Sequence, residues 1–475
     1  MIRRYYATKD NTITNAFEEN LTTRGTGSNM GASDIVEVFS IYAQATSASA
    51  ELARTLIQFD ISEISTARSG GQIPASGSVS FYLKMYNAPH SQTTPSNFTL
   101  SVQGVSGAWQ EGFGIDMDFY EDLTRDVVGS NWIKRSGSTS WSTQGGDFYS
   151  DSSSSFTQDF STGLEDLCVE VTPLVEQWIT GSSGGGKDNN GFVVKLTNAL
   201  EATSKSYFRK KFFGRDSEFY FQRPVLEARW DSSRKDDRGY FFASSSLVSA
   251  EDNLNKLYLY NRVRGQLKDY PIAPTSASIR LSSTAAPASN LAVATVGRVS
   301  TGIYSASIAV ATTASTVSDI WYSGSVGYHT GTIQVKTFES LDYNPEDSYV
   351  LSMPGFQRQY RKNQTHRLSL YVREKNWGPN IHTTAVKSSI PSLIIPSASF
   401  QLRRCIDDYV VVPYGTGSST EAAHTGLSYD VSGNYFDLDT TYLEAGYAYD
   451  IQYSFYDEEN GWEEQPYRFK FRVVD

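Results

Sequence analysis

Four carboxylates crowd one loop in the first half of the chain, at Asp116, Asp118, Glu121 and Asp122. Two carboxylates held at a suitable separation supply the acid and the base of glycoside hydrolysis. The same oxygen atoms could instead bind calcium weakly, or they could simply be solvated. We favour a solvated loop or a weak calcium site over glycan cleavage, and we therefore expect no catalytic residue here.

Three tryptophans, Trp109, Trp132 and Trp141, lie in one irregular stretch at 104–160. The flat apolar face of an aromatic ring can pack on a sugar ring. A loop excursion of this length inside a compact domain usually has a function or forms an interface. These three residues are therefore the candidate carbohydrate-binding set. The alternative is that tryptophans such as Trp109 pack in the core or against its edge.

Two further stretches look like anion-binding sites. Residues 181–188 nearly spell a phosphate-binding loop, but Asp188 stands where Ser or Thr should bind magnesium, and a helix is expected before the loop instead of after it. Residues 207–213 interleave aromatic rings with three cations, a pattern that can bind single-stranded nucleic acid. We interpret the first as a surface loop. The second is expected to be an exposed strand with a basic rim, or a docking site for an acidic protein face.

Residues that bind transition metals are few and scattered. The histidines show no metal-ligand spacing, and they are His90, His329, His366, His382 and His424. Cys168 and Cys405 lie far apart, which favours two buried free thiols over a disulfide. No nucleophile elbow or other short catalytic signature occurs. We therefore predict no metal site, no cofactor and no enzyme activity.

The composition argues against several function classes. The 475 residues carry a formal net charge of −11, and nucleic acid is not expected as the main partner because phosphate binding needs a dense cationic surface. No stretch approaches the roughly 20 apolar residues of a membrane helix, so no membrane insertion is expected. The 30 Tyr and only 5 Met favour strands and polar interfaces over helical bundles.

The start of the chain bears on its compartment. Arg3 and Arg4 have no apolar run behind them, so no secretory signal peptide is predicted. A strand-rich chain without an export signal or a disulfide framework fits synthesis in a cytoplasm. A virion protein that is released by lysis has this combination, and so does a chain that has lost its signal.

The strand that organises the first half is predicted at 53–61. Ile57, Phe59 and Ile61 fall on one face of a period-2 pattern, so the strand should be half-buried, with that face on a core. Further strands of this region are expected at 35–41, 79–85, 98–102, 169–171, 192–196, 219–221 and 225–230.

One short helix is predicted after the strand at 169–171. Thr172 is a suitable N-cap, and Pro173 fits the first helical position. Leu174, Val175 and Trp178 share one face of that helix, as core-facing residues do.

Composition and strand spacing divide the chain into three regions. A charged segment at 232–238 marks the end of a first domain, 1–235. Regions 239–345 and 346–475 carry short strands at turn-punctuated intervals, which is typical of Ig-like β-sandwiches. The stretch 443–449 has a Leu, a turn Gly and Tyr ahead of a strand, which predicts a tyrosine corner whose ring hydroxyl bonds back to the main chain.

Several stretches of the first region carry a family resemblance, and they are 53–64, 79–83, 108–111, Trp132, Trp141, 169–181, 190–192 and 219–230. In this order they resemble the DNRLRE family of carbohydrate-binding-like jelly-roll modules, over about residues 5–231. Gln58 and the long insertion at 112–157 depart from that pattern. The resemblance implies that the first domain is a jelly-roll β-sandwich.

The stretches 258–261 and 428–438 are similar to virion structural proteins of tailed phages of marine bacteria. That resemblance implies a tail, baseplate, neck or fibre-attachment component. The sequence thus predicts an all-β chain, a jelly-roll sandwich followed by two Ig-like sandwiches, located in the virion. Its expected partners are other virion structural proteins and copies of itself in a symmetric oligomer. The alternative is a carbohydrate-binding adhesin that recognises host surface glycans.

Overall fold

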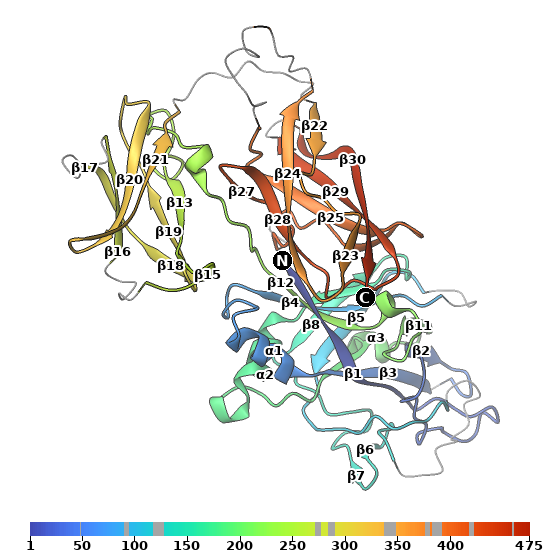
Figure 1. Ribbon diagram of the computed structural model, residues 1–475. Coiled ribbons are helices and arrows are strands. Elements are labelled where there is room, and N and C mark those ends of the chain that lie inside the picture. The colour runs from blue at the N-terminus through green and yellow to red at the C-terminus, as the bar shows by residue number, and fades with distance from the viewer. Residues whose placement is uncertain are drawn as a thin grey trace. The chain divides into compact units, whose positions relative to one another are not determined.

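The computed structural model describes residues 1–47, 49–89, 95–116, 128–270, 277–283, 290–336, 348–375, 381, 392–417, 422–457 and 460–475. The chain forms two compact units, Met1–Asp231 and Ser232–Asp475. Strands dominate both units, so the predicted all-β class is confirmed (Figure 1). The predicted boundary between 345 and 346 lies outside the described residues.

The strands of the first unit are β1 Ile2–Thr14, β2 Ile35–Tyr42, β3 Ala50–Phe59, β4 Ser80–Met85, β5 Phe98–Gly104, β6 Lys134–Ser136, β7 Thr139–Ser140, β8 Ser155–Phe160, β9 Leu167–Glu170, β10 Phe192–Leu196, β11 Tyr207–Phe213 and β12 Val225–Arg229. Its helices are α1 Ile61–Ser69, α2 Thr172–Thr180 and α3 Asn198–Glu201, with short 3₁₀ turns η1 Ser182–Gly184 and η2 Tyr220–Gln222. The strand predicted at 219–221 is therefore wrong. No helix among the described residues is long and apolar enough to cross a membrane.

The long strand β1 connects the two sheets of this unit. Its residues 2–6 pair with β12, and its residues 7–14 pair with β3 after a register shift between Ala7 and Lys9. One sheet runs β1-β12-β4-β9, and the other runs β8-β5-β10-β3-β1, with β2 and β11 added beside β3. These pairings are antiparallel, as in a jelly-roll sandwich.

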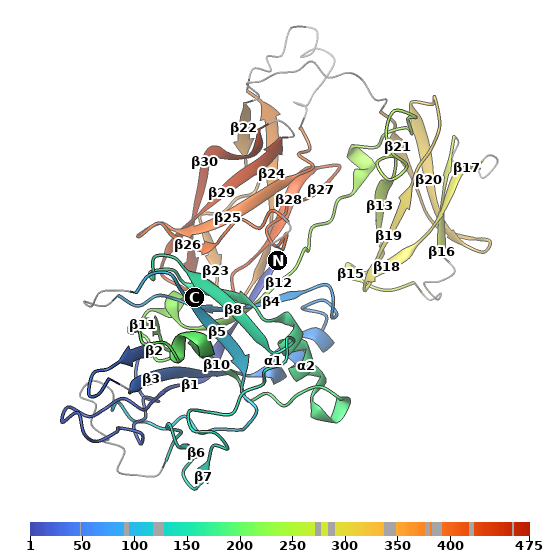
Figure 2. The same ribbon diagram turned by 180° about the vertical axis from the view of Figure 1, so that it is seen from behind.

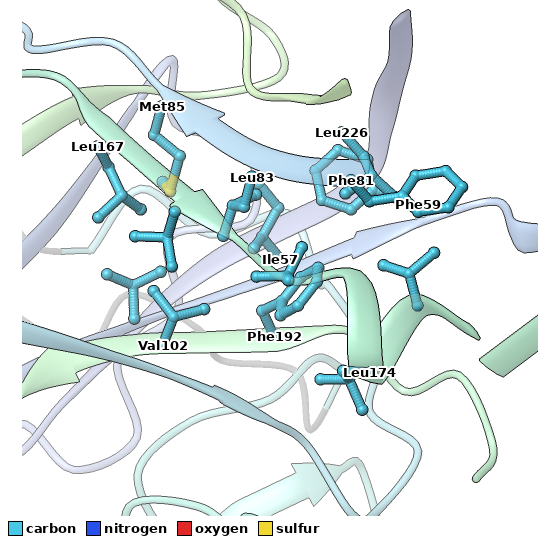
Figure 3. Close-up of a cluster of buried hydrophobic side chains, with 14 of the residues drawn as sticks. Ile57, Phe59, Phe81, Leu83, Met85, Val102, Leu167, Leu174, Phe192 and Leu226 are labelled. Carbon is cyan, nitrogen blue, oxygen red and sulfur yellow. The ribbon is translucent and has the colours of Figure 1, made fainter. Parts of the chain in front are cut away.

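Apolar side chains from both sheets fill the space between them (Figure 3). Ile57 and Phe59 of β3 lie with Phe81 and Leu83 of β4 and with Phe192 of β10, and all five are buried. The predicted strand pattern of the first half thus identifies the main core of this unit.

β3 is covered on both faces, although the sequence predicts a half-buried strand with only its apolar face on a core. Leu56 and Ile57 are neighbours, so their side chains point to opposite faces of the strand, and both are fully buried. Leu56 packs in a second cluster, with Ile13 of β1 and Val193 of β10. The prediction is wrong because the irregular stretch after β5 folds back over this face of the sheet.

Helix α1 was not predicted. Ile61 begins this helix and does not extend β3. Asp60 is its N-cap, and Oδ1 of Asp60 accepts the N–H of Ser62 at 2.8 Å, which satisfies one of the free donors of the first turn. Ile61 and Ile64 are buried on the main core.

The predicted helix at α2 is confirmed, with one correction at its start. The N-cap is Val171, and Thr172 is already helical. The hydroxyl of Thr172 instead accepts the backbone N–H of Phe81 at 2.8 Å, so it ties the helix to β4. Trp178 is buried in the main core, as its helical face predicts.

The second unit begins with η3 Asp237–Gly239 and contains two sandwiches. The strands of the first are β13 Asn255–Tyr260, β14 Arg262–Val263, β15 Gln266–Leu267, β16 Ala277–Ser282, β17 Asn290–Thr295, β18 Gly297–Ser300, β19 Ile303–Ile308, β20 Thr316–Ser323 and β21 Val326–Gln334. Those of the second are β22 Tyr349–Ser352, β23 Gln359–Arg361, β24 Thr365–Glu374, β25 Ala398–Arg404, β26 Tyr409–Val412, β27 Ser428–Asp430, β28 Gly433–Asp439, β29 Ala448–Asp457 and β30 Gly461–Val474.

The two sandwiches share one pattern of strand connections. The first has sheets β13-β19-β18 and β17-β16-β20-β21, and the second has β22-β24-β28-β27 and β23-β30-β29-β25-β26. In each, an early segment runs parallel to the end of the last strand: Phe242 pairs with Lys336, and β23 pairs with β30. The pairings between the other named strands are antiparallel, which is the Ig-like arrangement that the sequence predicts.

A tyrosine corner fixes the entry to β29. The hydroxyl of Tyr449 donates to the carbonyl oxygen of Glu444 at 2.8 Å and accepts the N–H of the same residue at 3.0 Å. The predicted corner at 443–449 is therefore confirmed, with Tyr449 as its tyrosine.

Candidate functional site

The three candidate sugar-binding tryptophans form part of an internal cluster. Trp109, Trp132 and Trp141 are only 3%, 5% and 5% exposed. We call this group the tryptophan cluster, and its members are Ile13, Leu56, Val105, Trp109, Trp132, Trp141 and Val193. The expectation that these rings are available to a sugar is wrong, because the stretch that carries them folds onto the second face of β3.

Polar atoms at the edge of the tryptophan cluster hold its rings in place. The indole N–H of Trp109 donates to the carbonyl oxygen of Asn190 at 2.8 Å. The indole N–H of Trp141 donates to the carbonyl oxygen of Asn131 at 2.9 Å. A buried indole needs such a partner, since an unpaired donor in an apolar site is costly. The bonds join segments far apart in sequence into one cover for the sheet.

Arg54 on β3 connects the tryptophan cluster to α3. Its guanidinium makes a bidentate pair with the carboxylate of Glu201, with Nε and Nη2 at 2.9 and 2.7 Å from the two oxygens. Nη1 donates to the carbonyl oxygen of Gly145 at 2.8 Å, and the guanidinium carbon lies 4.9 Å from the ring centre of Trp132. With these partners, Arg54 acts as a structural connector.

A second buried polar centre surrounds Asn29. Its amide oxygen accepts the N–H groups of Gly31 and Gly114 at 3.1 and 2.9 Å. Its amide nitrogen donates to the carbonyl oxygens of Glu111 and Ser130 at 2.7 and 2.8 Å. All the hydrogen-bonding capacity of this side chain is used to fasten the loop before β2 to the insertion.

Glycines make room for the Asn29 amide. Gly112 and Gly129 have φ angles of +84° and +106°, in the region that favours glycine. A Cβ on Gly112 would come within 2.4 Å of Oδ1 of Asn29, and one on Gly129 within 2.8 Å of Nδ2. The role of these glycines could not be predicted, since Asn29, which they enclose, lies far earlier in the chain.

Asp10 is the most perturbed carboxyl near this centre. It is fully buried, and burial raises its pKa to about 7, although the backbone N–H of Arg215, 2.6 Å from Oδ2, acts in the opposite direction. Glu111 accepts the N–H of Asp10 at 2.8 Å and Nε of Arg215 at 2.8 Å. The group is an ion pair with one enclosed acid, and perturbed carboxyls of this kind occur in structural networks as well as in active sites.

The acidic loop that suggested catalysis is only partly within the described residues. Asp118, Glu121 and Asp122 lie outside them. Asp116 is buried, and its carboxylate accepts the N–H of Asn29 at 2.9 Å. Asp116 therefore belongs to the buried centre around Asn29.

The glycine-rich stretch after α2 is held by an ion pair. Nζ of Lys187 lies 2.9 and 2.8 Å from the two carboxylate oxygens of Asp151 and contacts Ser154. The same nitrogen lies 4.5 Å from the ring centre of Tyr149. The lysine that resembles a phosphate ligand in sequence thus binds an acidic side chain of its own chain.

The cations of β11 also have internal partners. Arg209 and Lys211 both contact the carboxylate of Glu37, at 3.6 and 2.9 Å. Lys210 is buried, and its ammonium group donates to the side-chain oxygen of Asn87 at 2.7 Å and to two carbonyl oxygens. Burial lowers the pKa of Lys210 to about 8. The predicted exposed strand with a basic rim is therefore mostly an internal structure.

Both cysteines are free, and Cys168 is exposed, contrary to the prediction that both are buried. Among the residues that the structure describes, no group of three His, Cys, Asp or Glu side chains is placed to hold a metal ion. His90 and His382 lie outside those residues.

Among the exposed apolar side chains of the second unit, some lie on two strand features that the sequence did not lead us to expect. On β17, Leu291 and Val293 are exposed. On the hairpin of β29 and β30, Tyr456 and Trp462 are exposed, with ring centres 5.5 Å apart. The uncharged run 290–295 and the aromatic residues on both sides of the polar sequence 457–460 are the signals that could have identified them.

Comparisons with known proteins add no family. No family model matches the chain, and no curated protein matches it. A marsupial T cell receptor is 8% identical, with 46% of this chain and 68% of that chain covered and a TM-score of 0.17. The Yersinia pseudotuberculosis adhesin InvE is 13% identical, covering 46% and 54%, with a TM-score of 0.16. The Escherichia coli adhesin FdeC is 10% identical, covering 60% and 77%, with a TM-score of 0.16. Scores this low carry no functional argument.

Proposed function

We propose that this chain is a non-enzymatic structural protein of a tailed-phage virion that acts through protein–protein assembly. The proposal rests on one observation: reactive side chains that could serve a site are bound to partners within the first unit. Arg54, Glu111 and Lys187 each bind a partner inside the first unit. These groups stabilise the fold, and the function falls to the surfaces of the sandwiches.

The surfaces of the second unit support assembly. Interfaces between proteins are enriched in aromatic and aliphatic side chains at their centres, with a polar rim. Exposed Val293 and Trp462 have this character, and both lie on strands at or near the margin of a sheet. A sandwich offers such strands as ready sites for lateral contacts. The similarity of 258–261 and 428–438 to tailed-phage virion proteins supplies the setting.

Mass spectrometry of purified phage particles tests this proposal. Particles are banded by density, washed at high salt and digested, and peptides from both units are sought. We expect peptides from 1–231 and from 232–475 in the washed particles. Their absence, with the chain present only in the infected-cell lysate, would contradict the proposal.

A second candidate function is binding of host surface glycans. It rests on Tyr456 and Trp462, whose rings are 46% and 36% exposed, and not on the buried tryptophans of the first unit. An exposed ring face can pack on a sugar.

A glycan array with the intact chain tests this second candidate. Trp462→Ala should abolish any signal, whereas Phe208→Ala, which removes an exposed ring from the first unit, should leave it unchanged. An array without signal for the natural chain rules out the candidate over the glycans it displays. Equal signals from the natural chain and Trp462→Ala remove these two rings as the site.

A further inference from the structure

β17 is an outer strand with one free edge. Its residues pair with β16, for example Val293 with Arg280 and Thr295 with Ser278. Among the described residues, its other edge has no strand partner. β17 lies at the margin of its sheet in both views (Figures 1 and 2). An edge of this kind presents unpaired N–H and C=O groups that can receive another strand.

The side chains of β17 offer no protection against such pairing. Ala292 and Ala294 pack toward the sandwich core, so Leu291 and Val293 point away from it, with exposures of 38% and 53%. The segment 290–295 contains no charged residue and no proline. Charged residues, proline and irregular edges are the usual means of keeping outer strands apart.

The opposite margin of the same sheet is better protected. β21 contains Gly327 and Gly331, and its pairing with β20 has a register shift between Trp321 and Tyr322. Beyond its end, Lys336 pairs with Phe242. Glycine and a register shift both interrupt a flat template for a further strand. Of the two edges of this sheet, β17 is therefore better suited than β21 to receive a further strand.

We propose that two copies of this chain pair through β17, antiparallel about a two-fold axis beside Val293. Val293 then lies opposite Val293 of the second copy, and Leu291 lies opposite Thr295. The two four-stranded sheets become one continuous sheet. This inference rests on the proposed role in assembly and names the contact that would serve it.

The uncharged, self-complementary edge of β17 suits a second copy as the occupant. Each chain carries a net charge of −11, so most approaches between copies bring like charges together. The β17 contact places no charged side chain of that strand against its counterpart. A two-fold contact also satisfies both free edges at once, because the same surface serves both copies.

The contact is small, which fits a repeated assembly better than a tight isolated dimer. Strand pairing over six residues buries less than the about 1,600 Å² of a standard interface. One such contact is expected to be weak between free chains. Copies already held in one particle meet at a high effective concentration, which strengthens weak contacts without new ones.

Sedimentation of the full chain over a concentration series tests the pairing. The natural chain should form a dimer below about 1 mM, with a dissociation constant that Val293→Lys raises at least about tenfold, because two lysines then face each other. Val326→Lys is the matched control, since Val326 is 52% exposed on the opposite edge, and it should dimerise as the natural chain does. A chain that stays monomeric, or equal dimerisation by Val293→Lys, overturns the proposal.

Cross-linking gives a readout that does not depend on loss of a contact. In a background with Cys168→Ser and Cys405→Ser, Val293→Cys should form a disulfide-linked dimer on mild oxidation, and Val326→Cys should not. Equal cross-linking at both positions contradicts the pairing. The particle analysis above is independent, since a chain could pair through β17 and yet be absent from virions, or be present and not pair.

Discussion

Asp10 is a carboxyl group enclosed by protein on the second half of β1. One oxygen accepts the N–H of Arg215, while the other, Oδ1, has no hydrogen-bond partner among the residues that the structure describes. Removal from water disfavours the charged form, and the pKa rises from 3.8 to about 7. The ionised acid is therefore a cost to the fold near neutral pH.

Replacement of Asp10 by Asn should change how stability depends on pH. The folded-state pKa of Asp10 lies above its ordinary value. The unfolding free energy of the natural chain is therefore highest below about pH 4, where Asp10 is protonated in both states. It falls by roughly 4 kcal/mol as the pH rises through about 7. Asn does not titrate, so Asp10→Asn should gain on the natural chain between pH 5 and pH 8, in urea unfolding of the first unit. Asp34→Asn controls for the loss of one exposed charge. A pH-independent difference would refute the assignment.

Asn29 stabilises the same part of the fold, and it does so through hydrogen bonds of its amide group. Asn29→Ala leaves two N–H groups and the carbonyl oxygen of Glu111 without this partner in a buried site, whereas the carbonyl oxygen of Ser130 keeps its bond from Asn11. We expect a loss of at least about 3 kcal/mol in the unfolding free energy of the first unit. Asn20→Ala, in an exposed turn, should cost about 1 kcal/mol or less. Similar losses for both variants would show that the buried centre is not critical.

At the scale of elements, β3 shows what sequence can and cannot predict. The alternation of Ile57 and Phe59 correctly identifies a strand with a face on the main core. The opposite face depends on a segment fifty to ninety residues away, and no local pattern reveals that Trp109 and Trp141 return to cover Leu56. α1 was missed for a different reason: Ile61 continues the alternation of the strand, although Asp60 and Glu63 provide a helix-start signal.

Because the tryptophan cluster is internal, we expect substitution of one of its rings to reduce stability and not ligand binding. Trp141→Ala removes a large buried side chain and should cost about 3–5 kcal/mol, seen as faster proteolysis within 1–231 while 232–475 stays protected. Trp462→Ala, at an exposed ring, should leave proteolysis of the first unit unchanged. An undiminished stability together with a loss of glycan binding by Trp141→Ala would contradict the internal role of the cluster.

The tyrosine corner makes a second prediction at this scale. Tyr449→Phe keeps the ring and removes both hydroxyl bonds to Glu444, so the second unit should lose about 1–2 kcal/mol. Tyr447→Phe, at a neighbouring ring that lies 5.1 Å from the guanidinium of Arg404, should cost less. Thermal unfolding of both variants measures the difference, and a larger loss for Tyr447→Phe would contradict the assignment of the corner.

At the scale of the whole molecule, the chain is a series of β-sandwiches. Two Ig-like sandwiches with the same connections follow a jelly-roll unit in which Arg54 and Lys187 pair with carboxylates of the same unit. Strand spacing was enough to predict the two Ig-like sandwiches, because each strand needs only a short local pattern, whereas the jelly roll was implied by the family resemblance. The sequence can mark the stretches around Val293 and Trp462 as candidates, but their exposure depends on which sheet margin each strand occupies.

The number of copies in each particle tests the central claim most directly. Quantitative mass spectrometry of purified virions, with isotope-labelled peptides from both units and from the major capsid protein, gives that number. The proposed structural role predicts a fixed copy number that is a multiple of the symmetry of one virion component and is unchanged by high-salt washing. A variable trace that washing removes, or no peptide at all, would contradict the account.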